Sequence, residues 1–303
     1  MEFDINIDKI NEIANIELLA KQLVEGFITG LHKSPYHGFS VEFAEHRLYN
    51  YGESTRHIDW KVFAKTDRLY TKRYEEETNL RCAIVLDNSS SMYYPQPNNG
   101  KIKFAILASA ALAYLLQKQR DAVGLFTFSD KIELQTEIKS TSTHVHKLML
   151  ELQRLLQHTE QRKKTNVADV LHQIAEKVHK RSLVIIFSDM LQSTDDQEEV
   201  FSALQHLKHN KHEVLLFHVH DRDTELDFNF EDRPYQFHDL ESGQVLKLTP
   251  TAIKDAYHQR MSDLFKELFL KCTQLKIDLV DADVRNGFDT ILTSYLIKRS
   301  KMK

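Results

Sequence analysis

The sequence has little cysteine and little glycine, and both shortages exclude classes of function. Two cysteines among 303 residues, Cys82 and Cys272, do not make a disulfide framework and indicate free thiols in a reducing compartment. Eight glycines leave few loops that can cradle phosphate, and neither G-x-x-x-x-G-K-[ST] nor G-x-S-x-G occurs. A nucleotide-hydrolysing P-loop and a serine-hydrolase elbow are therefore excluded.

A long apolar run and a strong charge bias are also missing. The most apolar stretch, "FAILASAALAYLL", has about 13 residues against the roughly 20 that cross a bilayer, so it predicts a buried helix. The first residues are acidic and show no signal peptide. A formal net charge of −4 gives no overall attraction to nucleic acid. We expect a cytoplasmic protein with no transmembrane segment and no nucleic-acid partner.

The first part of the chain differs in character from the rest. Isoleucine and leucine at helical spacing predict a helix over residues 7–31. Residues 34–78 then carry aromatic and charged side chains with turn signals in "SPYHG" and "YNYGES", and they end in the strand-like "DRLYTKRYEEET". We therefore expect an N-terminal unit over residues 1–80, made of this helix and an extended β-like segment, before a main domain over residues 81–303.

The main domain alternates short apolar runs with helical patterns. The strand-like runs include "CAIVLD", "DAVGLFTFS", "SLVIIFSD", "HEVLLFHVHD" and "KIDLVDAD", and "KIELQTEI" alternates as an edge strand would. Strands this rich in Val, Ile and Leu must be buried on both faces. The pattern predicts an α/β fold, a doubly wound and mainly parallel sheet with helices on both faces, with a β-hairpin insertion over about residues 223–249.

Carboxylates and hydroxyls follow several of these strands. Asp87 ends the first core strand with Ser89 and Ser91 just beyond it, Asp189 ends a later one, and Thr165 immediately precedes a helix. In an open α/β sheet the functional crevice lies beyond the carboxyl ends of the strands. Local backbone caps would explain "DNSSSM" taken alone, but three stretches that deliver oxygen atoms to one edge favour a site.

The chemistry of these side chains favours a hard divalent cation. Magnesium takes oxygen ligands, keeps some waters and is usually held by one or two carboxylates. We therefore predict Mg²⁺, or Mn²⁺, at Asp87, Ser89, Ser91, Thr165 and Asp189. Because most direct ligands would be neutral, the ion would remain electrophilic, and a carboxylate from a partner could complete its shell.

The same residues resemble the metal-ion-dependent adhesion site of von Willebrand factor A domains. D-x-S-x-S followed by Met92, then a loop threonine, then an aspartate after a later strand fits in order and spacing from residue 82 to about 300. In that family the two serines and the threonine contact the metal and the aspartates support it. The third motif is often Thr-Asp-Gly there, whereas Met190 stands at the glycine position here. The loop after Asp189 is thus expected to differ.

The preceding segment, "GFSVEFAEHRLYNYGESTRHIDWKVFAKTDRLYTKRYEEETN", resembles the signature of the bacterial family called domain of unknown function 58 (DUF58). The positions that carry this resemblance are Gly38, Glu42, Phe43, Arg47, Tyr49, Gly52, Arg56, Asp59, Trp60, Lys61, Lys72 and Glu77. Glu53 stands where an aspartate is more usual. The resemblance implies a non-enzymatic protein that works with a MoxR-type AAA+ ATPase, as an adaptor or co-chaperone for an unidentified client.

Other interpretations of these segments are weaker. The basic and aromatic residues of the signature segment would also suit phosphate or single-stranded nucleic acid. Glu42, Glu45 and Asp59 lie close in the sequence and could pair with Arg47 and Arg56, which favours a structural or protein-contact role. Metal-assisted phosphoester hydrolysis at Asp87 and Asp189 is the remaining enzyme alternative, and it lacks an evident general base.

The sixteen histidines raise the question of a zinc site. His218 and His220 would share one face of a strand, and His206 and His209 one face of a helix. Neither pair has a third ligand at a recognised spacing, and H-E-x-x-H is absent. Surface or packing roles are therefore favoured for these histidines.

Overall fold

The computed structural model describes residues 15–33, 46–49, 60–72, 80–95, 100–157, 166–190, 197–240 and 243–302. The chain divides into two compact units, a large one over residues 1–27 and 80–303 and a small one over residues 28–79. Most of the first helix, α1 (Ile16–Lys33), therefore belongs to the large unit, whereas the sequence pattern groups it with the segment that follows.

The small unit contains part of the DUF58-like signature segment. Strand β1 (His46–Leu48) pairs antiparallel with β2 (Tyr70–Lys72), and helix α2 (Trp60–Thr66) lies between them in the chain. Trp60 is 60% exposed and meets Phe63 edge to face. Glu42, Arg56 and Asp59 lie outside the described residues, and only the backbone is described for Arg47 and Lys61. The role of this group stays a prediction.

The large unit is built on a six-stranded sheet with the strand order β10-β7-β6-β3-β4-β5. All neighbouring strands run parallel except β5, which pairs antiparallel with β4 at one edge. This arrangement confirms the predicted doubly wound, mainly parallel sheet and its edge strand. The strands are β3 (Arg81–Asp87), β4 (Ala122–Phe128), β5 (Ile132–Gln135), β6 (Leu183–Ser188), β7 (Glu213–His220) and β10 (Asp278–Asp283).

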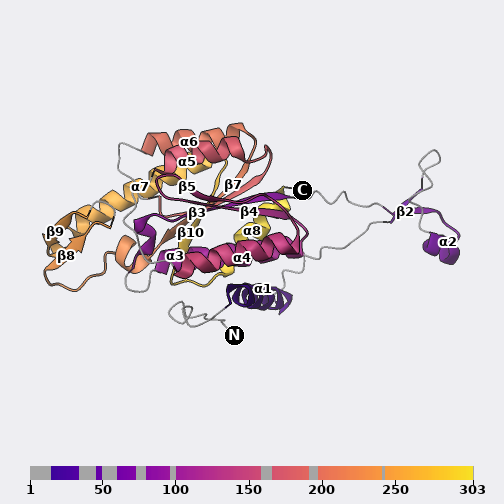
Figure 1. Ribbon diagram of the computed structural model, residues 1–303, viewed down its shortest axis with the longest axis horizontal. Helices are drawn as coiled ribbons and strands as arrows, with labels where there is room; N and C mark the ends of the chain where they lie inside the picture. The colour runs from indigo at the N-terminus through magenta and orange to yellow at the C-terminus, as the bar shows by residue number, and fades with distance from the viewer. Residues whose placement is uncertain are drawn as a thin grey trace. The chain divides into compact units, whose positions relative to one another are not determined.

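Helices cover both faces of this sheet (Figure 1). One face carries α3 (Gly100–Lys118), α4 (Ser142–Gln157) and α8 (Asp289–Lys301); the other carries α5 (Val167–Lys177), α6 (Gln197–His209) and the C-terminal part of α7 (Lys254–Gln274). We call the second the α5/α6 face. Helix α1 joins α4 through the N–H of Ile16, which donates to Oε1 of Gln153 at 2.9 Å.

Helix α3 forms the centre of the core, as the sequence predicts. Among the described helices it is the one with the length and apolarity of a membrane span, and 89% of that stretch is buried inside the protein. Helix α3 has apolar residues on all sides, because the sheet, α4 and α8 together cover it.

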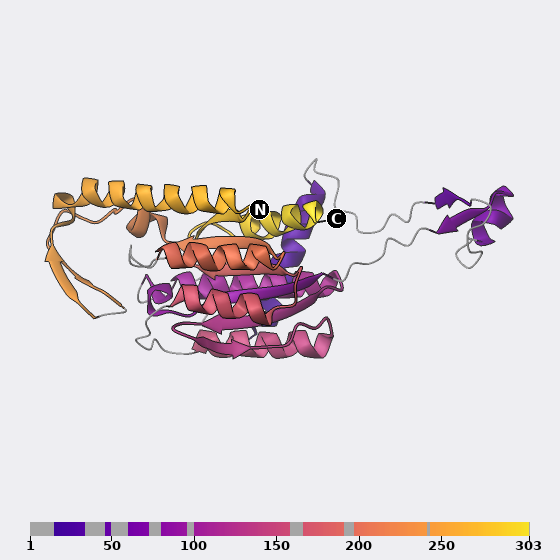
Figure 2. The ribbon, with the colours of Figure 1, turned by 90° about the horizontal axis from the view of Figure 1, so that it is seen from above.

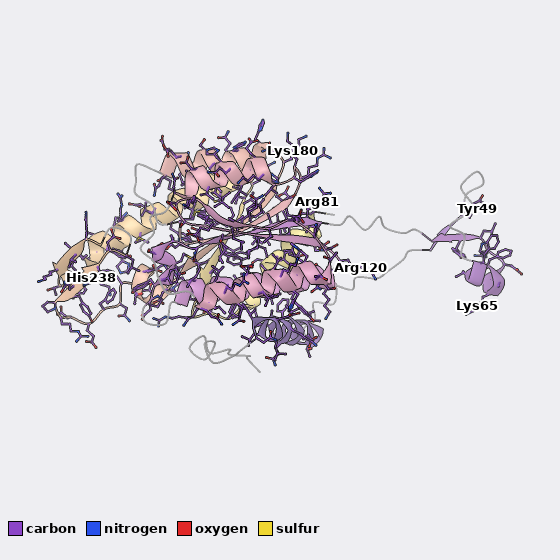
Figure 3. All side chains as sticks on the ribbon, viewed as in Figure 1. Tyr49, Lys65, Arg81, Arg120, Lys180 and His238 are labelled. Carbon is purple, nitrogen blue, oxygen red and sulfur yellow. The ribbon has the colours of Figure 1, made fainter. Side chains whose placement is uncertain are left out.

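An insertion extends from the carboxyl end of the sheet. A π-helical turn, Arg222–Leu226, follows β7 and leads to the antiparallel hairpin of β8 (Tyr235–His238) and β9 (Val245–Leu248). Figure 2 shows the N-terminal half of α7 running out beyond the sheet beside this hairpin. In Figure 3, His238 on the hairpin and Arg81 at the amino end of β3 lie at opposite ends of the large unit. The carboxyl ends of the strands therefore lie on the hairpin side.

A substitution at Gly124 in β4 tests how tightly this strand packs against residues 137 and 138. A Cβ at this position would lie 2.8 Å from Cγ1 of Ile138 and 3.0 Å from the backbone O of Glu137. We expect Gly124→Ala to lower the free energy of unfolding by about 1 to 3 kcal/mol, because a backbone carbonyl must move. Gly287→Ala is the matched control, since nothing lies within 4 Å of its added Cβ. Urea denaturation of both variants measures the difference, and equal effects would contradict the packing.

Candidate functional site

Polar side chains replace apolar ones at the carboxyl end of the strands on the α5/α6 face. Along β3, Ala83 and Val85 pack in the core of this face and Asp87 follows at the next position of the same parity. The same change occurs on the neighbouring strands, where Ser188 ends β6, His218 and His220 end β7, and Asp281 and Asp283 end β10. The strand register aligns them, so the fold creates one continuous polar edge.

Asp87, at the end of β3, has no exposed surface. Its Oδ1 accepts a hydrogen bond from the N–H of Ser89 at 2.9 Å, and its Oδ2 accepts one from the hydroxyl of Ser188 at 2.6 Å. Burial, together with the nearby charge of Asp189, raises the pKa of Asp87 despite these bonds. A nearby cation would offset both effects.

The two predicted serine ligands lie side by side. The hydroxyl oxygens of Ser89 and Ser91 are 3.0 Å apart. Ser89 has extended backbone and precedes a single 3-10 turn over Ser90–Tyr93, in which Ser90 and Met92 are buried. Tyr93 is buried as well, so the turn is packed against the core while it brings the hydroxyls of Ser89 and Ser91 together.

Asp189 completes the predicted carboxylate pair but has a partner that the sequence pattern did not reveal. Lys101, fully buried in the first turn of α3, donates from Nζ to Oδ2 of Asp189 at 2.9 Å and to Oε1 of Glu225 at 2.5 Å. The ring of Tyr94 lies 5.8 Å from the same ammonium. Glu225 is held in turn by the N–H of Asp221, which donates to its Oε2 at 2.8 Å. Helix α3 and the π-helical turn after β7 are therefore tied together at the site.

Electrostatics favour the charged form of this lysine. Burial by itself lowers the pKa of Lys101, but the carboxylates of Asp189 and Glu225 outweigh burial and the net direction is upward. For Glu225, burial is the largest influence and the net pKa is raised although Lys101 acts against it. The ammonium therefore stays protonated at neutral pH and supplies one positive charge to the two acidic groups.

The loop after Asp189 adopts a glycine-like conformation without glycine. Met190 has φ of 50°, in the left-handed region, and its N–H donates to the hydroxyl of Ser188 at 3.0 Å. The sequence leads us to expect a different loop geometry here because glycine is missing. Met190 nonetheless adopts the left-handed backbone that favours glycine, at a cost of about 1 kcal/mol or more.

Thr165, the remaining predicted ligand, lies outside the described residues. The residue after it is well placed: the N–H of Asn166 donates to the carbonyl of Ser129 at 3.2 Å, directly beyond β4. The side chain of Asn166 then caps α5 by accepting from the N–H of Asp169. Of the five predicted ligands, the structure thus brings Asp87, Ser89, Ser91 and Asp189 to one edge, and Lys101 and Glu225 are additions to it.

A small cavity of about 50 Å³ opens beside Asp189 on the α5/α6 face. Its walls come from β7 and from helices α6 and α7, and they include His218, Phe201, Met261 and Phe265. Burial is the main reason that the pKa of His218 falls to about 4, so its ring is neutral at pH 7. The polar edge therefore continues from the aspartates to the histidines of β7.

The strand order, the antiparallel edge strand and the helices on both faces (Figure 1) give this α/β domain a von Willebrand factor A-like fold. The chain belongs to the family described as "Protein of unknown function DUF58", whose model matches residues 45–265.

Several known proteins are similar to parts of this chain. Uncharacterized proteins of Mycobacterium tuberculosis and Mycobacterium bovis are 24% identical over 215 residues, which is 71% of this chain and 66% of theirs. The hypothetical protein BatB from Bacteroides thetaiotaomicron matches 74% of this chain and 98% of its own, at 16% identity and a TM-score of 0.49. An aerotolerance-related membrane protein from Bacteroides fragilis matches 73% and 99%, at 15% identity and a TM-score of 0.47.

Lys101 should contribute strongly to stability. We expect Lys101→Met to lower the free energy of unfolding by about 3 kcal/mol, because it leaves the buried carboxylate of Asp189 and the largely buried one of Glu225 without their cation. Arg154→Met is the control: this arginine pairs with Glu151 at 2.7 Å on the surface, and its loss should change stability by less than about 0.5 kcal/mol. Chemical denaturation compares the two. A Lys101→Met protein as stable as the Arg154→Met control would contradict the role given to this ion pair.

Proposed function

We propose that this protein is a non-enzymatic, metal-dependent protein-binding module. In this proposal Asp87, Ser89, Ser91, Thr165 and Asp189 hold Mg²⁺ or Mn²⁺ at the carboxyl edge of the sheet, and a carboxylate of a protein partner completes the coordination. The observation that carries the proposal is the pair of serine hydroxyls 3.0 Å apart, beside a fully buried aspartate.

The residues present fit an oxygen-preferring divalent ion. Hydroxyl and carboxylate oxygens are ligands that Mg²⁺ and Mn²⁺ prefer. The buried carboxylate of Asp87 has a raised pKa, so an added cation would relieve an existing cost rather than create a new one. When bound, the ion would supply a Lewis-acidic position for an incoming carboxylate.

The residues around the ligands keep the edge rigid. Asp87 fixes the backbone of Ser89 by accepting its N–H, and Ser188 fixes the carboxylate of Asp87. Lys101 donates a hydrogen bond to Asp189, which holds that carboxylate in place, and it also balances the negative charge of Glu225. Such preorganisation reduces the ordering cost of binding a partner, because the side chains are already in place.

The proposed partner follows from the family resemblance. As part of the same proposal, the partner is a MoxR-type AAA+ ATPase together with an unidentified client, and the protein acts as an adaptor or co-chaperone in the cytoplasm, where ATP is available. Capture experiments test both the ATPase and the client.

Magnesium should stabilise the folded protein. At a concentration 100-fold above its dissociation constant, a ligand that binds only the folded state adds about 2.7 kcal/mol, which corresponds to a rise in Tm of roughly 5 °C for a protein of this size. We expect this rise with Mg²⁺ or Mn²⁺ at pH 8 and a smaller one at pH 5.5. The pKa of Asp87 is raised, so at the lower pH protons compete with the ion for its carboxylate. Differential scanning calorimetry with and without chelator measures it.

Serine variants in the same turn provide a matched comparison. Ser91→Ala and Asp87→Asn should lose the rise in Tm, whereas Ser90→Ala should keep it, because Ser90 lies in the same turn but is not one of the proposed ligands. If all three variants respond to magnesium as the parent does, the ion binds elsewhere and the proposal is wrong.

Partner capture tests the second half of the proposal. We expect the full chain to capture a protein partner from a lysate of its source in millimolar Mg²⁺, and to lose it in chelator or as Asp87→Asn. The same samples should be assayed with p-nitrophenyl phosphate and with single-stranded DNA. Metal-dependent turnover that disappears in Asp87→Asn would favour the phosphoester hydrolase alternative and contradict a purely binding role.

A further inference from the structure

His218, His220 and Asp281 lie together, although His220 and Asp281 are 61 residues apart in the chain. His218 and His220 are alternate residues of β7 and so share one face of the sheet. Asp281 is the direct register partner of His218 on the parallel strand β10, and register partners in a sheet project from the same face. Strand register, rather than sequence spacing, therefore assembles the three side chains.

Their donor atoms converge. One nitrogen of each histidine and one carboxylate oxygen of Asp281 all lie within 4.8 Å of one another. Nε2 of His220 already contacts Oδ1 of Asp281, and the two imidazole rings have centroids 5.3 Å apart. Tetrahedral ligands about 2.1 Å from a zinc ion are roughly 3.4 Å apart, so modest side-chain rotations bring this set onto one ion.

Within the described part of the chain, one ring nitrogen of each histidine lacks a hydrogen-bond partner. His218 is 5% exposed and His220 is 2% exposed, yet Nδ1 of each is buried with no hydrogen-bond partner among the described residues. An unsatisfied buried polar group costs about 1 to 3 kcal/mol. The ring of Phe265 packs against His218 in a T-shaped arrangement, with 5.2 Å between the ring centroids. It closes the site on the α7 side without supplying a hydrogen bond.

We propose that His218, His220 and Asp281 form a second metal site, specific for a divalent first-row transition ion such as Zn²⁺. Two imidazoles and one carboxylate are the donor set that suits zinc, whereas magnesium prefers oxygen ligands alone. Asp281 is 48% exposed, which gives an ion access from solvent, and His218 lines the cavity beside Asp189, which leaves room for a water as the fourth ligand. The site is separate from the proposed magnesium ligands and stands whether or not they bind metal.

Zinc binding by the full chain tests the proposal. Protein stripped with chelator and exchanged into chelator-free buffer should bind one Zn²⁺ by isothermal titration calorimetry, with a dissociation constant on the order of 1 µM or tighter. Excess Mg²⁺ should not displace it. Asp281→Asn and His220→Ala should each weaken binding at least about 10-fold. Asp281 is half exposed, so its variant should fold, and circular dichroism checks that it does.

Two controls locate the ion. A second pair, His172 and His206, has Nδ1 atoms 3.0 Å apart, and Nε2 of His206 lies 2.9 Å from Oε1 of Glu176. His172→Ala should leave zinc affinity unchanged, and so should Asp87→Asn. Loss of binding in His172→Ala or in Asp87→Asn, with Asp281→Asn unaffected, would place zinc elsewhere and overturn the proposal. Absence of zinc binding by the parent protein would overturn it as well.

Discussion

The carboxylate of Asp87, buried at the end of the central strand, is the constraint on which the rest of the edge depends. It accepts from the backbone of Ser89 and the hydroxyl of Ser188, and so joins the turn after β3 to the end of β6. A charge with no exposed surface must be compensated. These two hydrogen bonds and, in our proposal, a divalent ion provide that compensation, while Lys101 balances the charge of the neighbouring Asp189. The serine turn, the Asp189 loop and the first turn of α3 are arranged around this requirement.

Along the α5/α6 face of the sheet, the side chains change from apolar to polar near the carboxyl ends of the strands. Apolar side chains fill the α5/α6 face until the last positions of the strands, where aspartate, serine and histidine replace them. The polar groups are thus held by rigid strands and yet lie at the boundary of the core. Lys101 and Glu225 add a salt bridge that connects helix α3 to the insertion after β7. A partner or an ion acting on Asp189 would therefore also act on the base of the insertion that carries the hairpin.

Sequence patterns predicted the fold and the strand-end residues well because both depend on local signals. Apolar runs of strand length ended at Asp87 and Ser188, and the alternation of strands and helices predicted the parallel sheet. Lys101 was missed, because it lies in a helix that is apolar all round and its partner Glu225 is 124 residues away. The third member of the histidine cluster was missed for the same kind of reason. Asp281 meets His218 only through the register of β7 and β10, which no spacing in the sequence records.

In our proposal the two serine hydroxyls belong to a metal site. Crystals grown with Mn²⁺ and measured by anomalous scattering test it most directly. We expect an anomalous peak about 2.1 Å from both Oγ of Ser89 and Oγ of Ser91. A peak remote from both serines, or no peak at saturating Mn²⁺ in crystals where this edge is open to solvent, would contradict it.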